Sequence, residues 1–292
     1  MKGVNRMMFS QKTSGGHRKA CTAFGVIIIV IAILAYSPSD AAPVAVRSPE
    51  GVIHGYLLVR SPVGETLGQG ELTQVLKDGG LVESHLVFRF KDGSLHDEKV
   101  AFSQQRVFTM IRYRLIQRGP SFPEQMNVSI DRGTAEYTVR SQAGKHGGEK
   151  VLTGHFDLPT DVYNGMLVVV LKNLLKGANK TVNFLVFTPA PEAIKLHLLL
   201  MGERTVHIGD LSSKAMLYVF KPEIGRIREF FGKVFGKLPV DFHYDCWITT
   251  DDEVPGFVQF EGPLQLMGPD VRVELVSPRL AATPEDKRTP AN

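Results

Sequence analysis

The stretch LVESHLVFRF, residues 81–90, alternates between two sets of side chains and is followed by the turn pair Asp92-Gly93. In an extended strand, successive side chains point to opposite faces. One face would carry Val82, Ser84, Leu86, Phe88 and Phe90, and the other Leu81, Glu83, His85, Val87 and Arg89. The alternation predicts a strand of an antiparallel sheet that packs on one face and is partly wet on the other. Asp-Gly between two apolar runs predicts a hairpin.

Similar short runs, separated by turns, fill most of the chain. On the N-terminal side, strands are expected over residues 52–60, 71–77, 81–90, 98–105, 107–117, 125–130 and 135–142, with a loop over 61–70. On the C-terminal side they are expected over 181–189, 193–203, 205–211, 215–221, 240–249, 255–264 and 271–278. This spacing predicts a mainly β protein, with one β-rich domain over residues 45–278 built on a large antiparallel sheet.

Residues 158–180, LPTDVYNGMLVVVLKNLLKGANK, interrupt the strands and predict a helix from Pro159 to Gly177. The apolar residues Met166, Leu167, Val170, Leu171, Leu174 and Leu175 follow helical spacing. Val168 and Val169 widen this stripe almost all round, which favours a buried helix. We therefore expect a curved sheet or half-barrel wrapped around a buried apolar helix.

The stretch Ile224–Lys237 mixes aromatic and basic residues and supports two interpretations. As a helix, it would place its aromatic side chains on one face and suit contact with a membrane surface. Packing against the core with extended lysines is the alternative, and a turn followed by a strand also fits its three glycines.

The N-terminus predicts an export signal over residues 1–41. Five basic residues precede the 14-residue apolar run Ala23–Tyr36, and Ser39-Asp40-Ala41 offers a cleavage site. The alternative is an uncleaved inner-membrane anchor that faces the periplasm, although spanning takes about 20 apolar residues. Cys21 precedes the apolar run, so no lipid anchor is expected. The tail 279–292 is polar and proline-containing, which predicts disorder.

Charge and cysteine content argue against nucleic-acid binding and against an internal disulfide. Residues 1–41 contain five of the 34 Lys and Arg and one of the 30 Asp and Glu, so the remainder carries 29 of each. The neutral remainder gives no basic surface for nucleic acid. Only Cys246 remains after removal of the signal, which excludes an internal disulfide.

The stretch FHYDCWITT, residues 242–250, combines a cysteine, a histidine and acids. Strand alternation places Cys246 on the apolar face with Phe242, Tyr244 and Ile248, so a structural cysteine is favoured over a nucleophile. Asp241, His243 and Asp245 share the other face, and these ligand types could hold a divalent metal. A solvated or ion-paired strand face is the simpler interpretation. No GxSxG, Walker A or GxGxxG motif occurs, so no cofactor is expected.

The apolar residues are the main functional clue. The sheet and helix could simply form a filled core, or they could leave a cleft for an acyl chain. In the second case we expect Met166, Leu167, Val170 and Leu171 to face the ligand, together with Phe88 and Phe90.

The layout over residues 50–278 resembles that of bacterial envelope proteins of unknown function, with the phrases LPTDVYNG, GKLPVDFHYDCWI and VPGFVQFEGPL as landmarks. These proteins are similar to half-barrel carriers of lipoproteins and lipids. The resemblance implies an exported, periplasmic and non-enzymatic protein that binds or carries a hydrophobic, acyl-containing ligand. A metal-dependent hydrolase using Asp241, His243 and Asp245, or a protein-binding scaffold, is the alternative. The oligomeric state stays open.

Overall fold

The chain is described from a computed structural model, in which Ala41–Asn292 is the second of two units. The described residues are 42–144, 147–176, 178–187, 189–208, 211–223, 243–249, 255–265 and 268–276, all in the second unit. The expected export signal, the whole stretch Ile224–Lys237 and the tail 279–292 therefore lie outside the described residues.

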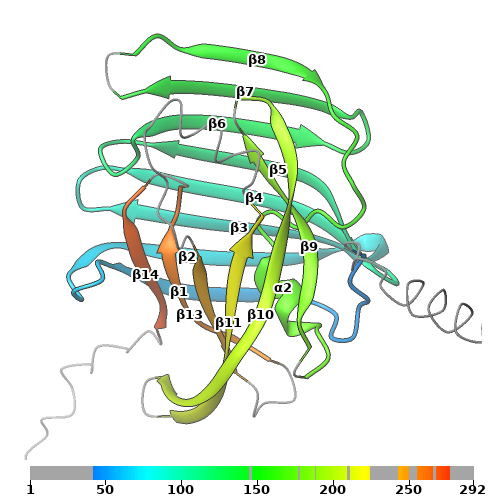
Figure 1. The fold of residues 1–292 in the computed structure, drawn as a ribbon, viewed down its shortest axis with the longest axis vertical. Coiled ribbons are helices and arrows are strands. Elements are labelled where there is room, and N and C mark those ends of the chain that lie inside the picture. The colour runs from blue at the N-terminus through cyan, green and yellow to red at the C-terminus, as the bar shows by residue number, and fades with distance from the viewer. Residues whose placement is uncertain are drawn as a thin grey trace, which may run out of the picture. The chain divides into compact units, whose positions relative to one another are not determined.

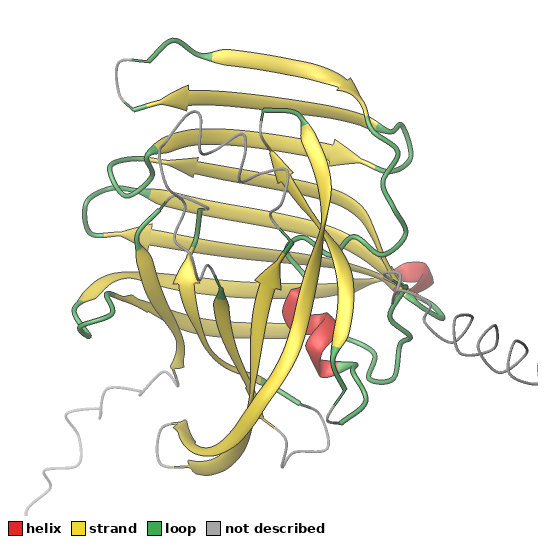
Figure 2. Ribbon diagram, viewed as in Figure 1, coloured by secondary structure: helices red, strands yellow, loops and turns green. Residues whose placement is uncertain are grey.

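Strands dominate the described part of the chain (Figure 2). The strands are β1 (Ile53–Arg60), β2 (Thr66–Lys77), β3 (Leu81–Phe90), β4 (Leu95–Gln104), β5 (Phe108–Arg118), β6 (Glu124–Asp131), β7 (Glu136–Ala143), β8 (Lys150–His155), β9 (Lys180–Phe187), β10 (Pro191–Ile208), β11 (Leu211–Pro222), β12 (Tyr244–Thr249), β13 (Phe257–Pro263) and β14 (Asp270–Val276). The helices are the 3₁₀ turn η1 (Asp78–Gly80) and the α-helix α2 (Leu167–Lys172).

All fourteen strands of the described residues belong to one antiparallel sheet, which confirms the prediction of a mainly β protein with a large antiparallel sheet (Figure 1). The order is β8-β7-β6-β5-β4-β3-β2-β1-β14-β13-β12-β11-β10-β9. Strand β1 pairs with β14, so the first and last strands meet in the middle. The N-terminal half (β1–β8) runs from there to one edge, and the C-terminal half (β9–β14) runs to the other.

Strand β3 follows most of the alternation from which the sheet was predicted, although Val87, expected on the partly wet face, is buried. Val82, Phe88 and Phe90 are buried, whereas Glu83 and Arg89 are exposed. The predicted Asp92-Gly93 hairpin joins β3 to β4.

The loop expected over residues 61–70 is shorter than predicted, because β2 begins at Thr66 and includes two glycines. Gly68 pairs with Phe90, and Gly70 pairs with Phe88. A Cβ atom on Gly70 would overlap the ring of Phe88. The glycine therefore makes room for an aromatic side chain across the strand pair, where the sequence indicated a turn.

Two strands expected over 193–203 and 205–211 form the single strand β10, which pairs with β9 and β11. The register shifts between Leu200 and Gly202, so the glycine accompanies an irregularity in the strand rather than ending it.

The predicted helix over 159–177 is much shorter, since α2 spans only Leu167–Lys172. Two features before it favour a non-helical chain. Gly165 has a φ of 68°, which a right-handed helix does not allow. The Asn164 side chain accepts a hydrogen bond from the Leu185 backbone N–H at 2.7 Å and donates one to the Leu185 carbonyl at 2.9 Å. These bonds hold the chain against β9 and compete with helix formation.

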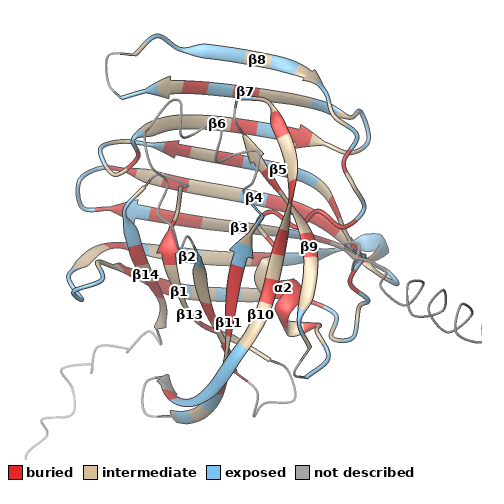
Figure 3. Cartoon of the chain, in the orientation of Figure 1, coloured by how far each residue is buried: buried red, intermediate tan, exposed pale blue. Residues whose placement is uncertain are grey.

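The main core lies between the two halves of the sheet (Figure 3). Its buried residues come from β3–β7, from β9–β12, from the chain between β8 and β9, and from Val44 before β1. A second cluster collects Leu57, Val59, Phe88, Phe90, Phe122, Val271 and Val273 near the junction of β1 with β14.

Candidate functional site

Residues 156–176, here termed the crossing segment, follow β8 and lead toward β9, the two edge strands of the sheet. The segment contributes buried apolar side chains to the main core from Leu158, Val162, Tyr163, Met166, Val169, Val170 and Leu171. It thus enters the interior as a continuous piece of chain that contains α2.

The crossing segment brings together four of the six expected ligand contacts. Met166, Val170 and Leu171 are buried in the main core, with 1%, 0% and 3% of their surface exposed. Leu167 is partly buried and packs against the same core. Phe88 and Phe90 instead belong to the second cluster. The six residues therefore divide between two apolar clusters.

Polar contacts hold the end of the crossing segment. The Lys172 ammonium lies 2.6 Å from a carboxylate oxygen of Glu50, and both side chains are more than nine-tenths buried. Gln74 donates a hydrogen bond to the other oxygen of Glu50 at 3.0 Å. The Asn173 side chain accepts hydrogen bonds from the backbone N–H groups of Arg47 and Ser48 at 2.8 and 2.7 Å. The segment is therefore fastened to the chain that precedes β1.

A partly buried carboxyl group, that of Glu98, lies beside the crossing segment. Tyr113 donates a hydrogen bond to Glu98 at 2.8 Å. Burial raises the pKa of the Glu98 carboxyl, and the hydrogen bond from Tyr113 opposes that shift. A Cβ atom on Gly165 would lie 3.3 Å from the Glu98 carboxyl carbon. This acid is therefore part of the interior packing at the turn before α2.

Cys246 is a buried structural cysteine, as strand alternation predicted. It is 1% exposed and belongs to the main core with Ile248. Burial raises the pKa of its thiol well above the ordinary range, and the nearby Asp245 adds to this shift. The thiol is therefore held protonated and away from solvent.

The expected metal ligands are only partly described, because Asp241 lies outside the described residues. The His243 ring lies 3.8 Å from the Asp245 carboxylate, an ion pair when the histidine is protonated. Burial raises the pKa of Asp245, and His243 opposes this shift. Within the described ranges, no three His, Cys, Asp or Glu side chains are grouped so that they could hold a metal ion.

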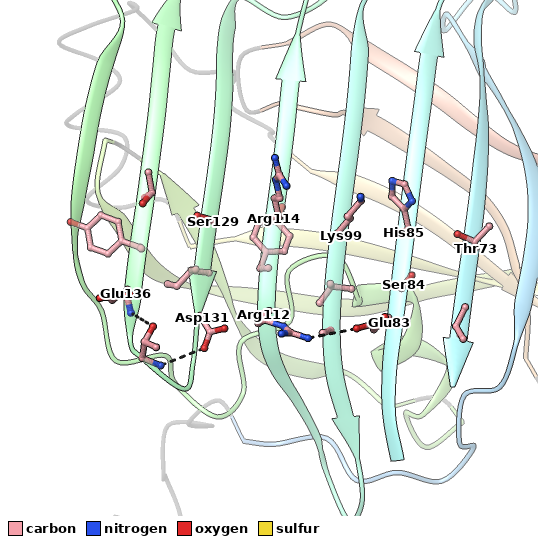
Figure 4. A pocket seen from close by; sticks show the side chains of 18 residues that line it. Thr73, Glu83, Ser84, His85, Lys99, Arg112, Arg114, Ser129, Asp131 and Glu136 are labelled. Carbon is pink, nitrogen blue, oxygen red and sulfur yellow. Dashed lines mark hydrogen bonds and ion pairs between the residues drawn. The ribbon is translucent and has the colours of Figure 1, made fainter. Parts of the chain in front are cut away.

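A hollow of about 630 Å³, lined by both polar and apolar residues, lies over β2–β7 (Figure 4). Its walls carry Lys99, Arg112 and Arg114, which are exposed on strands whose alternate residues are buried in the main core. The hollow therefore opens on the outer face of the N-terminal half, away from the crossing segment.

Comparison of the chain with protein-family models, curated proteins and solved structures gave no significant match. No helix in the described part of the chain has both the length and the apolar character needed to cross a membrane.

Two features of these sites were not predicted. Glu50 precedes the first strand, and nothing in its local sequence indicates a contact with Lys172, 122 residues later. Lys99 and Arg114 occupy separate runs, and their proximity depends on the pairing of β4 with β5. The alternating basic residues of Arg112-Tyr113-Arg114 were the only local signal.

Proposed function

We propose that this protein is an exported, non-enzymatic binding protein that holds or carries an acyl-containing ligand in the periplasm. The proposal also includes a more detailed description of the fold, in which a curved, half-barrel-like sheet surrounds an apolar segment that the ligand replaces. One observation carries it, namely that the crossing segment inserts a continuous series of apolar side chains between the two halves of the sheet.

An acyl chain has the chemistry needed to replace that segment. Fully exposing a large apolar side chain costs roughly 1.5–3 kcal/mol, so releasing the segment's seven buried residues costs on the order of 10–20 kcal/mol. Each buried methylene of a ligand contributes about 0.8 kcal/mol, which amounts to roughly 11 kcal/mol for a chain of about 14 methylenes. The two quantities are similar in size, so exchange between segment and ligand is energetically feasible.

The polar contacts suggest where such an exchange would be controlled. Lys172 and Glu50 are the charged pair at the end of α2. Opening this pair to water restores solvation to both charges, which offsets part of the lost attraction. We therefore expect the segment to leave from its α2 end, with Met166, Leu167, Val170 and Leu171 giving up their contacts to the ligand.

The fluorescent fatty acid cis-parinaric acid provides a direct test with the purified protein. We expect saturable binding at one molecule per chain, together with faster amide hydrogen exchange in the crossing segment and unchanged protection in β3–β6. Lipid extraction and native mass spectrometry of protein taken directly from cells should detect an acyl lipid. Absence of both uptake and co-purified lipid would refute the proposal.

Two matched variants separate displacement of the segment from general loosening. Val170 lies in the main core and Val59 in the second cluster, and both are fully buried. Val170→Ala weakens the packing of the segment and should tighten binding, about tenfold for each 1.4 kcal/mol of packing lost. Val59→Ala should lower stability without this gain. Equal effects of the two substitutions would contradict displacement of the segment.

A further inference from the structure

The outer face of β2–β7 carries a row of hydrogen-bond donors across six strands. In the antiparallel register, neighbouring strands place Thr73, His85, Lys99, Arg114, Ser129 and Thr138 opposite one another in turn. All six line the hollow. Figure 4 shows His85, Lys99 and Arg114 on three adjacent strands, with their side chains pointing the same way.

Lys99 and Arg114 form the centre of this row and stand directly opposite each other on β4 and β5. Like charges in directly opposite positions of an antiparallel pair destabilise the sheet. Among the described residues, neither side chain has a hydrogen bond or an ion pair that would offset this repulsion. The repulsion is therefore a cost to folding that no internal contact explains.

Two basic neighbours of this pair have acidic side-chain partners. Arg112 lies 3.6 Å from Glu83, and the His85 ring lies 2.9 Å from Asp97. Asp131 accepts a hydrogen bond from the backbone N–H of Gly133 at 2.7 Å. Lys99 and Arg114 are therefore the basic residues of the hollow that have no acidic side-chain partner among the described residues.

We propose that Lys99 and Arg114 bind the phosphate group of a small molecule in this hollow. An arginine guanidinium offers a planar pair of donors to phosphate oxygens, and a lysine ammonium adds a mobile point charge. The volume of about 630 Å³ lies within the range of small-molecule sites. Figure 4 shows Glu83, Asp131 and Glu136 in a second row with Arg112, so an anion must be compact to contact Lys99 and Arg114 without reaching these carboxylates.

This site does not depend on the proposed acyl binding, because its side chains lie on the opposite face of the sheet from the crossing segment. Loss of acyl uptake would leave the phosphate site intact, and loss of phosphate binding would leave acyl uptake intact. The two proposals can therefore fail separately.

The test is isothermal titration of the purified protein with inorganic phosphate and with glycerol 3-phosphate, at low salt. We expect about one phosphate to bind per chain, with a dissociation constant of about 1 mM or tighter. Glycerol 3-phosphate should bind more tightly than inorganic phosphate if the hollow also contacts its glycerol group. Lys99→Gln and Arg114→Gln should each weaken binding at least about tenfold, because each removes a charged hydrogen bond.

Arg118→Gln is the matched control, since Arg118 is exposed on the same strand and face as Arg114. It should leave phosphate affinity unchanged. Because removal of either central charge relieves the repulsion, Lys99→Gln and Arg114→Gln should keep or raise the melting temperature. This combination separates a binding role from a structural one.

Several outcomes would overturn the proposal. One is that the wild-type protein binds neither phosphate compound at concentrations up to about 10 mM, which is about the weakest affinity of a specific site. Another is that Lys99→Gln and Arg114→Gln bind phosphate as tightly as the wild-type protein does. Binding to vesicles containing phosphatidylglycerol, without binding to glycerol 3-phosphate, would replace the small molecule with a membrane surface and would also overturn it.

Discussion

His96 makes the stability of the folded chain depend on pH in a way that can be calculated. It is buried on β4 between the rings of Phe88 and Phe122, with centroid distances of 5.4 and 6.4 Å. The Gln117 amide nitrogen donates to the Leu264 carbonyl at 2.7 Å and lies 3.1 Å from His96 Nδ1. Since the amide donates, Nδ1 must accept, which requires an unprotonated Nδ1.

Burial lowers the pKa of His96 from 6.5 to about 4, although Asp97 opposes the shift. Between these two values, the unfolded chain binds a proton that the folded chain does not. The stability from this group is therefore complete above pH 6.5 and is lost as the pH falls toward 4. At pH 5 the loss amounts to about 2 kcal/mol relative to pH 8.

The assay is urea unfolding at pH 8 and pH 5, for wild type and for His96→Asn. Asparagine keeps an acceptor near the position of Nδ1 but does not titrate. The variant should be less stable at pH 8 because it leaves a small cavity, and its loss between pH 8 and pH 5 should be smaller than that of wild type by about 2 kcal/mol. His155→Asn, at an exposed position on β8, is the control and should retain the wild-type pH dependence. An equal pH dependence in His96→Asn and wild type would refute the argument.

Two further predictions concern the crossing segment. Lys172→Met leaves the Glu50 carboxylate buried without its counter-charge. It should therefore lower the free energy of unfolding, measured by urea titration, by about 3–5 kcal/mol. Adding Glu50→Gln in a double variant should restore most of this loss. A loss below about 1 kcal/mol would mean that water reaches the pair. Gly165→Ala should cost about 1–2 kcal/mol from its positive φ, plus the crowding of Val100 at 3.3 Å. Gly64→Ala, also at positive φ but without neighbours within 4 Å, should show the backbone cost alone, so equal losses would exclude crowding.

Local periodicity was enough to predict most of the sheet. The two-residue alternation of residues 81–90 indicates which side chains are buried, because neighbouring side chains on a strand must face opposite ways. The same rule placed Cys246 in the core and separated it from His243 before any contact was known. Both results depend on residues a few positions apart, where the backbone itself transmits the pattern.

The length of the helix could not be obtained in this way. The apolar spacing of residues 166–175 is helical, yet α2 covers only Leu167–Lys172. Asn164 forms its hydrogen bonds with Leu185 in β9, and these bonds exist only once β9 is in place beside the segment. Gly68 and Gly70 likewise indicated a loop, until pairing with β3 put Phe90 and Phe88 opposite them.

The sequence by itself therefore determined the class of fold, the burial of alternate residues and the burial of Cys246. These properties follow from backbone geometry over a few residues. Only the tertiary structure decided that β1 pairs with β14, that Glu50 meets Lys172, and that Lys99 stands opposite Arg114. Each of these contacts joins segments separated along the chain, and strand pairing selects among many arrangements with the same local pattern. The candidate sites belong to this second group, since a site consists of side chains that the fold brings together.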